Sequence, residues 1–98
     1  MADEPWSDEE LEACVAVYAD VVKRGGCAKN MAKDVFIARG RKAAPGRNDT
    51  AILYRMQNIS HLMQENGKAF VMGWVPKANV GSGMVPRIED IMRKYDLI

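Results

Sequence analysis

The sequence has very few of the residues from which catalytic and metal sites are built. Its 98 residues include one histidine, His61, and two cysteines, Cys14 and Cys27. The cysteines have neither a Cys-x-x-Cys nor a Cys/His spacing, so neither a zinc site nor a disulfide framework is expected. A phosphate-binding glycine loop is also missing, because the segment GWVPKANVGSG lacks the required spacing. We therefore expect no enzymatic activity, no metal and no cofactor.

Long apolar runs are missing as well. No run approaches the ~20 apolar residues that span a membrane. The first residues, MADEPWSDEE, are acidic where a secretory signal is basic and then apolar. With 48% hydrophobic and 28% charged residues, the composition is that of an ordinary globular domain. The expectation is a cytoplasmic protein that makes no membrane contact and folds as one small helical domain over residues 1–98, with residues 1–6 flexible.

Two consecutive parts of the chain each carry charge of almost a single sign, the first acidic and the second basic. Between Asp3 and Asp20 there are seven acidic residues and no basic one. From Lys23 to Arg47 there are eight basic residues and a single acidic one, Asp34. Such a basic block is typical of a surface that binds polyanions, but it can equally pair with the acidic segment inside the fold.

Hydrophobic periodicity and helix caps predict the start of a helical bundle. A first helix is expected to begin near Asp8, because Ser7 and Glu10 form a capping box, and to end before Gly25 and Gly26. A second helix is expected over residues 29–42. The turn that follows it contains Pro45 and Gly46 and leads directly into a third periodic segment.

This third helix is expected over residues 50–65, and a fourth begins at Pro86, which suits the first turn of a helix. Residues 69–83 are rich in Gly and Pro and predict an extended loop that lays Phe70, Val71 and Trp74 across the helices. The expected fold class is mainly α: a small bundle of about four helices with a helix-turn-helix-like pair and one extended Gly/Pro loop.

The third expected helix has two unlike faces. At about 100° per residue, one side carries the apolar residues Ile52, Met56, Ile59 and Met63. The other side carries Tyr54, Gln57, Asn58, His61 and Gln64. Amide groups can read base edges, and Tyr and His can stack or contact phosphate. The alternative is a solvated face, or amides that cap and connect loops of the same domain.

The candidate DNA contacts combine this polar face with the basic block before it and the loop after it. They are Lys29, Lys33, Arg41, Lys42, Arg47, Tyr54, Arg55, Asn58, His61, Trp74 and Lys77. A basic helix, a tight polar turn and a reading helix are the organisation of helix-turn-helix proteins. The sequence therefore favours DNA binding.

The rival interpretation is a protein-interaction module or a homodimer. In this interpretation Trp74 and a Met-rich surface form the contact, and the basic block pairs with the acidic first helix. The methionines concerned are Met31, Met56, Met63, Met72, Met84 and Met92. Met-rich surfaces suit adaptable binding because the side chain is flexible and polarisable.

Three short motifs carry a family resemblance from Trp6 to Ile91. The succession PWSDEELEACVAVY, PGRNDTAILYRMQNIS and GWVPKANVG resembles the small N-terminal module attached to bacterial HNH-type restriction endonucleases and related modification-dependent nucleases. The Trp-x-x-Glu-Glu opening is also similar to Myb/SANT helices. The resemblance implies a DNA-associated accessory domain in restriction or phage defence, with Arg47, Arg55 and Asn58 at the matching polar positions.

The single histidine rules out an HNH motif in this chain, so the resemblance does not imply nuclease activity. The chain is expected to be either a fragment of a larger enzyme or a free-standing relative whose partner supplies the chemistry. The expected partners are DNA, with or without a modified base, and a nuclease.

Overall fold

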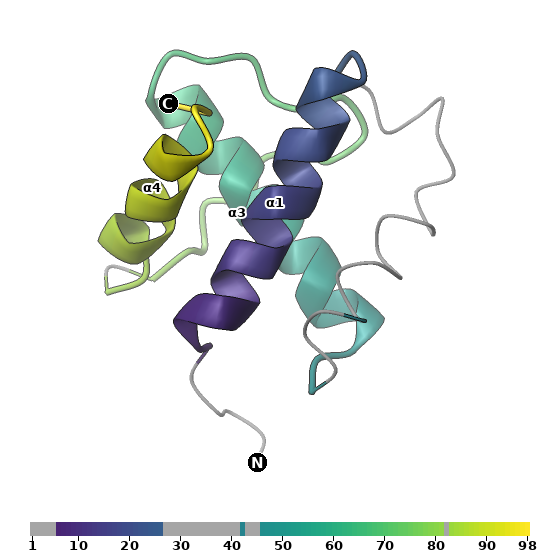
Figure 1. Cartoon of the computed structure of the whole chain (residues 1–98), viewed down its shortest axis with the longest axis vertical. Helices are drawn as coiled ribbons and strands as arrows, with labels where there is room; N and C mark the ends of the chain where they lie inside the picture. The colour runs from purple at the N-terminus through teal and green to yellow at the C-terminus, as the bar shows by residue number, and fades with distance from the viewer. Residues whose placement is uncertain (1–5, 27–41, 43–45, 82) are drawn as a thin grey trace.

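The computed structural model describes residues 6–26, 42, 46–81 and 83–98, which form a mainly helical structure (Figure 1). Helix α1 spans Asp8–Lys23, helix α3 spans Asp49–Glu65 and helix α4 spans Val85–Lys94. The mainly α class is confirmed, and these three helices lie where the sequence predicted them. The helix expected over residues 29–42, and with it the helix-turn-helix-like pair, lies outside the described residues except for Lys42.

Helices α1 and α3 begin at predicted capping residues. The Ser7 hydroxyl accepts from the Glu10 N–H at 3.1 Å, and the Glu10 carboxylate accepts from the Ser7 N–H at 2.9 Å, which confirms the capping box. Asn48 caps α3 by accepting from the Ala51 N–H at 2.8 Å. After α3, Gly67 has φ 73°, a left-handed conformation that glycine adopts without strain.

The core lies where the three helices meet, and the loop between α3 and α4 closes it. The apolar stripe predicted for α3 is confirmed, since all four of its residues are buried. The fully buried side chains include Leu11, Cys14, Val15, Tyr18 and Val21 from α1, Ile52, Met56 and Ile59 from α3, Ile88 and Met92 from α4, and Val71 and Trp74 from the loop. The loop is therefore part of the core, as its apolar residues predicted.

One hydroxyl connects α1, α3 and the loop. The Tyr18 hydroxyl accepts from the Val71 N–H at 2.9 Å and shares a hydrogen bond with the Ser60 hydroxyl at 2.8 Å. The Trp74 ring packs on the Tyr18 ring with centroids 5.5 Å apart. The buried hydroxyl groups thus satisfy one another, which avoids the cost of burying unpaired polar groups.

Helices α1, α3 and α4 all start nearer the lower end of the view in Figure 1 than they end. Helix α4 is joined to α1 by ion pairs near both of its ends, Arg87 with Asp8 at 2.8 Å and Lys94 with Glu12 at 2.9 Å. The start of α4 therefore lies beside the start of α1. No helix in the described part of the chain is long and apolar enough to cross a membrane.

Candidate nucleic-acid interface

The loop after Trp74 is attached to the polar side of α3 at Lys77. The Lys77 N–H donates to the Gln57 carbonyl at 3.1 Å, and the Lys77 carbonyl accepts from Asn58 Nδ2 at 2.8 Å. With its main chain held on both sides, Lys77 lays its ammonium group over the Tyr54 ring, 4.6 Å from the centroid. The attachment therefore fixes where this lysine side chain emerges.

The same attachment corrects the predicted position of Asn58. Asn58 was expected either to contact DNA or to connect loops of the same domain, and the second alternative is found, because the loop covers Asn58 and leaves it only 4% exposed. Its Nδ2 is bound to Lys77, and its Oδ1 accepts from Arg55 Nη1 at 3.2 Å. Since both ends of the amide are engaged inside the fold, Asn58 holds the loop and is not placed to read a base.

Trp74 is also placed differently from the DNA-contact prediction. Its side chain is 0% exposed and packs on Tyr18. The loop turns inward here because Val71, Trp74 and Val80 are apolar and bury together. Trp74 is therefore a core residue and is closed to a ligand in this conformation.

Arg47 joins the start of α3 to the start of α1. Its Nη2 and Nε donate to the two carboxylate oxygens of Glu10 at 2.8 and 2.9 Å, and its side chain is only 12% exposed. The hydrogen bond from Arg47 is the main reason that the pKa of Glu10 falls to about 2. In the structure, Arg47 therefore stabilises the fold by pairing with Glu10, in place of the expected free phosphate contact.

Trp6, which was expected in a flexible N-terminal segment, is held between charged groups. The Arg47 guanidinium lies 4.5 Å from its ring centroid and the Arg55 guanidinium lies 4.6 Å from it. The Trp6 carbonyl accepts from Arg87 Nη2 at 2.8 Å. The sequence did not predict this cluster, because it joins three segments that lie far apart in the chain.

Arg55 is half-buried on α3 and forms no ion pair within the described residues. Its Nη1 donates to Asn58, and its Nε is buried without an acceptor in the same part of the chain. Burial lowers its pKa, and the nearby Arg47 and Arg87 lower it further. Arg55 is thus a half-buried cation without a carboxylate partner among the residues that the structure describes.

The remaining predicted contacts are accessible or lie outside the described residues. Lys42 and Tyr54 are exposed, and His61 and Lys77 are half-buried. Lys29, Lys33 and Arg41 fall outside the described ranges. Together with Gln57 and Gln64, the residues Tyr54, His61 and Lys77 make up what we call the α3 polar surface. The exposed carboxylate of Glu65, one turn after His61, lies on the same side of α3.

The acidic side chains of α1 find basic partners in two places. Glu10 and Asp20 pair with Arg47 and Arg24 of the basic block, the latter at 3.1 Å. Asp8 and Glu12 pair with Arg87 and Lys94 of α4. The expected pairing inside the fold is thus found for two members of the block, while α4 supplies partners that the sequence did not predict.

The methionines do not form the surface that the rival interpretation required. Met56, Met63 and Met92 are buried in the core, and Met84 is half-buried. Of the methionines named for that surface, Met72 is exposed, at 52%, and Met31 lies outside the described residues. The predicted Met-rich surface is therefore wrong for Met56, Met63 and Met92, because these side chains lie on the buried faces of α3 and α4.

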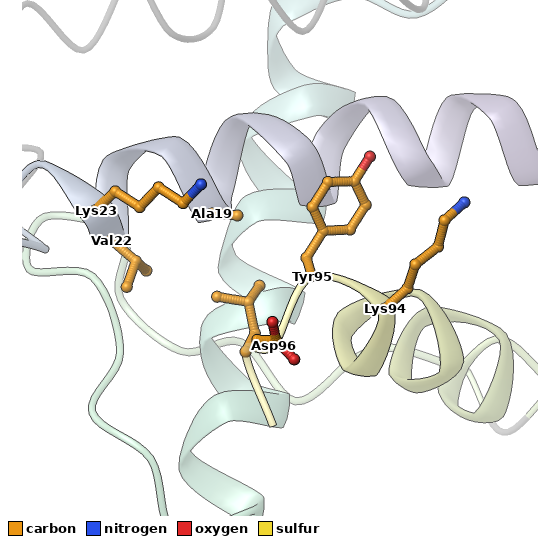
Figure 2. A pocket seen from close by; sticks show the side chains of 7 residues that line it. Ala19, Val22, Lys23, Lys94, Tyr95 and Asp96 are labelled. Carbon is orange, nitrogen blue, oxygen red and sulfur yellow. The ribbon is translucent and has the colours of Figure 1, made fainter.

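A hollow of about 360 Å³ lies between the C-terminal ends of α1 and α4 (Figure 2). Lys23 and Lys94 stand on two sides of it, with Tyr95 and Asp96 between them. The Lys94 ammonium is bound to Glu12, and Asp96 adds a carboxylate to the rim. Because its charges are mixed and partly paired, the hollow selects no class of ligand.

The sequence-based expectations for metal and thiol chemistry concern Cys14, Cys27 and His61. Cys14 is buried and free, and burial raises the pKa of its thiol to about 12, so it stays protonated and packs as an apolar group. Cys27 lies outside the described residues. Within those residues, no group of three or more His, Cys, Asp or Glu side chains could hold a metal ion.

No family model, curated protein or solved structure matches this chain. The resemblance to the N-terminal module of HNH-type restriction endonucleases therefore stays a prediction. The structure shows the contacts of three residues that belong to one of the motifs of this resemblance. Arg47, Asn58 and Ser60, all from the motif PGRNDTAILYRMQNIS, bind partners inside the fold. These three motif residues therefore help to stabilise the fold.

Proposed function

We propose that this chain is a non-catalytic DNA-binding accessory domain that contacts the DNA backbone through the α3 polar surface. The observation that supports the proposal is the fixed position of Lys77, whose main-chain N–H and carbonyl are both hydrogen-bonded to α3. Phosphate contacts come mainly from Lys, Arg and neutral polar side chains. Tyr54, His61 and Lys77 supply groups of this kind.

The basic block is the second part of the proposed contact. Lys42 is exposed just before α3, and Lys29, Lys33 and Arg41 precede it in the chain. Salt-dependent binding to phosphates increases with the number of cations that replace counterions. We therefore assign the block the larger share of the affinity and the α3 polar surface the orientation of the domain.

A role in restriction or phage defence, a nuclease partner, a modified base and a cytoplasmic location belong to the same proposal. They rest on the sequence motifs and on the composition. A methylated duplex compared with the unmodified duplex tests whether a modification is read. Tighter binding of the methylated duplex supports a modification-dependent role, and equal binding removes that part of the proposal.

Replacement of exposed side chains on the α3 polar surface tests the proposed contact. In Lys77→Gln and Tyr54→Ala, the main-chain bonds of Lys77 and the Asn58 amide remain in place, so the fold should be kept. We expect each variant to bind a fluorescent DNA duplex about three- to tenfold more weakly at low salt, with an unchanged thermal midpoint.

Lys68→Gln is the matched control, because Lys68 is an exposed lysine beyond the C-terminal end of α3. It removes the same charge from the molecule without touching the α3 polar surface. Equal affinity of wild type, Lys77→Gln and Tyr54→Ala would reject this surface as the contact. Equal losses in Lys68→Gln and Lys77→Gln would show an effect of net charge alone.

A protein-interaction module or homodimer is the second candidate function. The observation that favours it is the exposure of Val75, at 65%, and Met72, at 52%, in the loop between α3 and α4. Light scattering tests for the homodimer. A dimer that Val75→Ser disrupts would support this candidate, and a monomer at high protein concentration would reject the homodimer form.

A further inference from the structure

Arg55 carries a charge that the described residues do not balance. A guanidinium cannot lose its proton in a protein, so burial cannot neutralise it. Buried charges are therefore normally paired with an opposite charge. Arg55 has instead one hydrogen bond, to the neutral Asn58 amide at 3.2 Å, and a contact with the Trp6 ring. Its Nε has no acceptor in the described structure.

Two more guanidinium groups lie beside Arg55. Arg47 contacts the same Trp6 ring, and Arg87 donates to the Trp6 carbonyl. The carboxylates paired with them are Glu10, which binds Arg47, and Asp8, which binds Arg87. Among the described residues Arg55 has no carboxylate partner of its own, and the nearby Arg47 and Arg87 increase the positive potential at its guanidinium.

We infer that Arg55 binds a phosphate group at this arginine cluster. Arg55 is partly exposed, and its guanidinium keeps N–H donors, Nε–H among them, that have no acceptor among the described residues and suit the oxygens of a phosphate. The Trp6 ring and the Asn58 amide hold the guanidinium in place, so little side-chain freedom is lost on binding. A DNA backbone and free inorganic phosphate offer the same chemistry.

That the bound phosphate group belongs to a DNA backbone rests on the proposed function, whereas binding of free inorganic phosphate by Arg55 does not. Arg55 is on α3 one residue after Tyr54, so a backbone that reaches the α3 polar surface also has Arg55 in its neighbourhood. The site would then supply one fixed phosphate contact in addition to the contacts of Lys77 and the basic block. This contact would be less sensitive to salt, because partly buried charges are less screened.

The Arg55 Nε–H resonance of the ¹⁵N-labelled protein reports on the site directly. We expect sodium phosphate, added at constant ionic strength against sodium chloride, to shift this resonance with a saturable curve. Arg55→Gln should lose the saturable shifts of its neighbours, with an affinity at least about tenfold lower, and Arg55→Lys should bind at an intermediate level. Arg93→Gln is the control, because exposed Arg93 pairs only with Asp90 of its own helix among the described residues.

Small, linear shifts that are equal in wild type and Arg55→Gln, together with no effect of duplex DNA on the Arg55 resonance, would overturn the inference. The wild-type resonance decides the question even if Arg55→Gln fails to fold, because Arg55 also packs on Trp6. If phosphate saturates the shift and chloride does not, the site is selective for phosphate. If chloride saturates the shift as well, the site binds an adventitious ion only, and this result also overturns the inference.

A DNA titration separates this inference from the proposed function. Duplex that shifts the Arg55 resonance, with phosphate as a competitor, identifies the backbone as the source. Phosphate binding without any DNA binding supports the site and rejects the proposed function. DNA binding that is unchanged in Arg55→Gln and Arg55→Lys, without a phosphate effect, leaves the proposed function standing and rejects the site.

Discussion

At the scale of single residues, the ion pair between Glu10 and Arg47 organises the starts of α1 and α3. Both side chains are largely shielded, at 19% and 12% exposed, and the pair is bidentate. Pairs of this kind contribute more than exposed ones, because the geometry is fixed and solvent screening is reduced. Glu10 also completes the capping box of α1. One carboxylate therefore stabilises two helix starts.

Glu10→Gln should lower the free energy of unfolding by about 2 kcal/mol, because the amide removes the charge and leaves Arg47 without its counterion. Chemical denaturation at neutral pH measures this. The neighbouring Glu9→Gln is the control, since Glu9 is exposed, and its effect should stay within about 0.5 kcal/mol. Equal stability of the Glu10 and Glu9 variants would contradict the role of the pair.

The same pair predicts a dependence of stability on pH. The folded protein holds the pKa of Glu10 at about 2, below the ordinary value of 4.5. A lowered pKa stabilises the fold fully above the ordinary value, and this contribution is lost as the pH falls through the lowered value. The stability difference between wild type and Glu10→Gln should therefore be constant above about pH 5.5 and shrink between pH 4.5 and 2. A difference that does not change over this range would contradict the assignment.

At the scale of elements, the loop after Trp74 depends on one amide of α3. Asn58→Ala should leave the Lys77 carbonyl and Arg55 Nη1 without a partner, at a cost of about 1–3 kcal/mol in unfolding free energy. Hydrogen exchange at the Lys77 N–H should become faster. Gln57→Ala is the control, because Gln57 bonds to the loop through its carbonyl and not its side chain. Similar exchange rates in both variants would contradict this attachment.

The elements themselves were largely predictable because their signals are local. The Ser7 and Asn48 caps, the glycines after α1 and α3, and the stripes of apolar residues set the helix bounds from short stretches of sequence. The burial of Val71 and Trp74 was also predicted from the apolar residues of the Gly/Pro-rich loop, whereas Met72 and Val75 of the same loop are exposed.

The candidate site was much less predictable, because it depends on contacts between distant segments. A helical projection of α3 gives one buried face and one exposed face, which placed Asn58 in solvent. In the structure α3 is covered by α1 on one side and by the loop at Lys77 on another, so Asn58 and Ser60 are both buried. The charge pattern offered pairing of the basic block with the acidic segment as one of two alternatives, but it did not identify Arg47 and Glu10, 37 residues apart, as partners.

At the scale of the whole molecule, the described residues carry no net charge. The chain has 14 basic and 13 acidic residues. Outside the described ranges lie the basic residues Lys29, Lys33, Arg39 and Arg41 and the acidic residues Asp3, Glu4 and Asp34. Ten of each sign remain. If the chain binds DNA as proposed, the affinity must therefore come from the distribution of charge along the sequence, with the basic block and Lys77 as the contributing cations.

The most direct test of the account is the binding of the purified chain to a fluorescent DNA duplex at about 50 and 200 mM salt. If cations of the basic block and the α3 polar surface displace counterions from phosphates, affinity should fall at least about tenfold between the two conditions. The plot of log affinity against log salt should then be linear. Absence of binding at the lower salt, or an affinity that does not change with salt, would contradict DNA binding as the function of this chain.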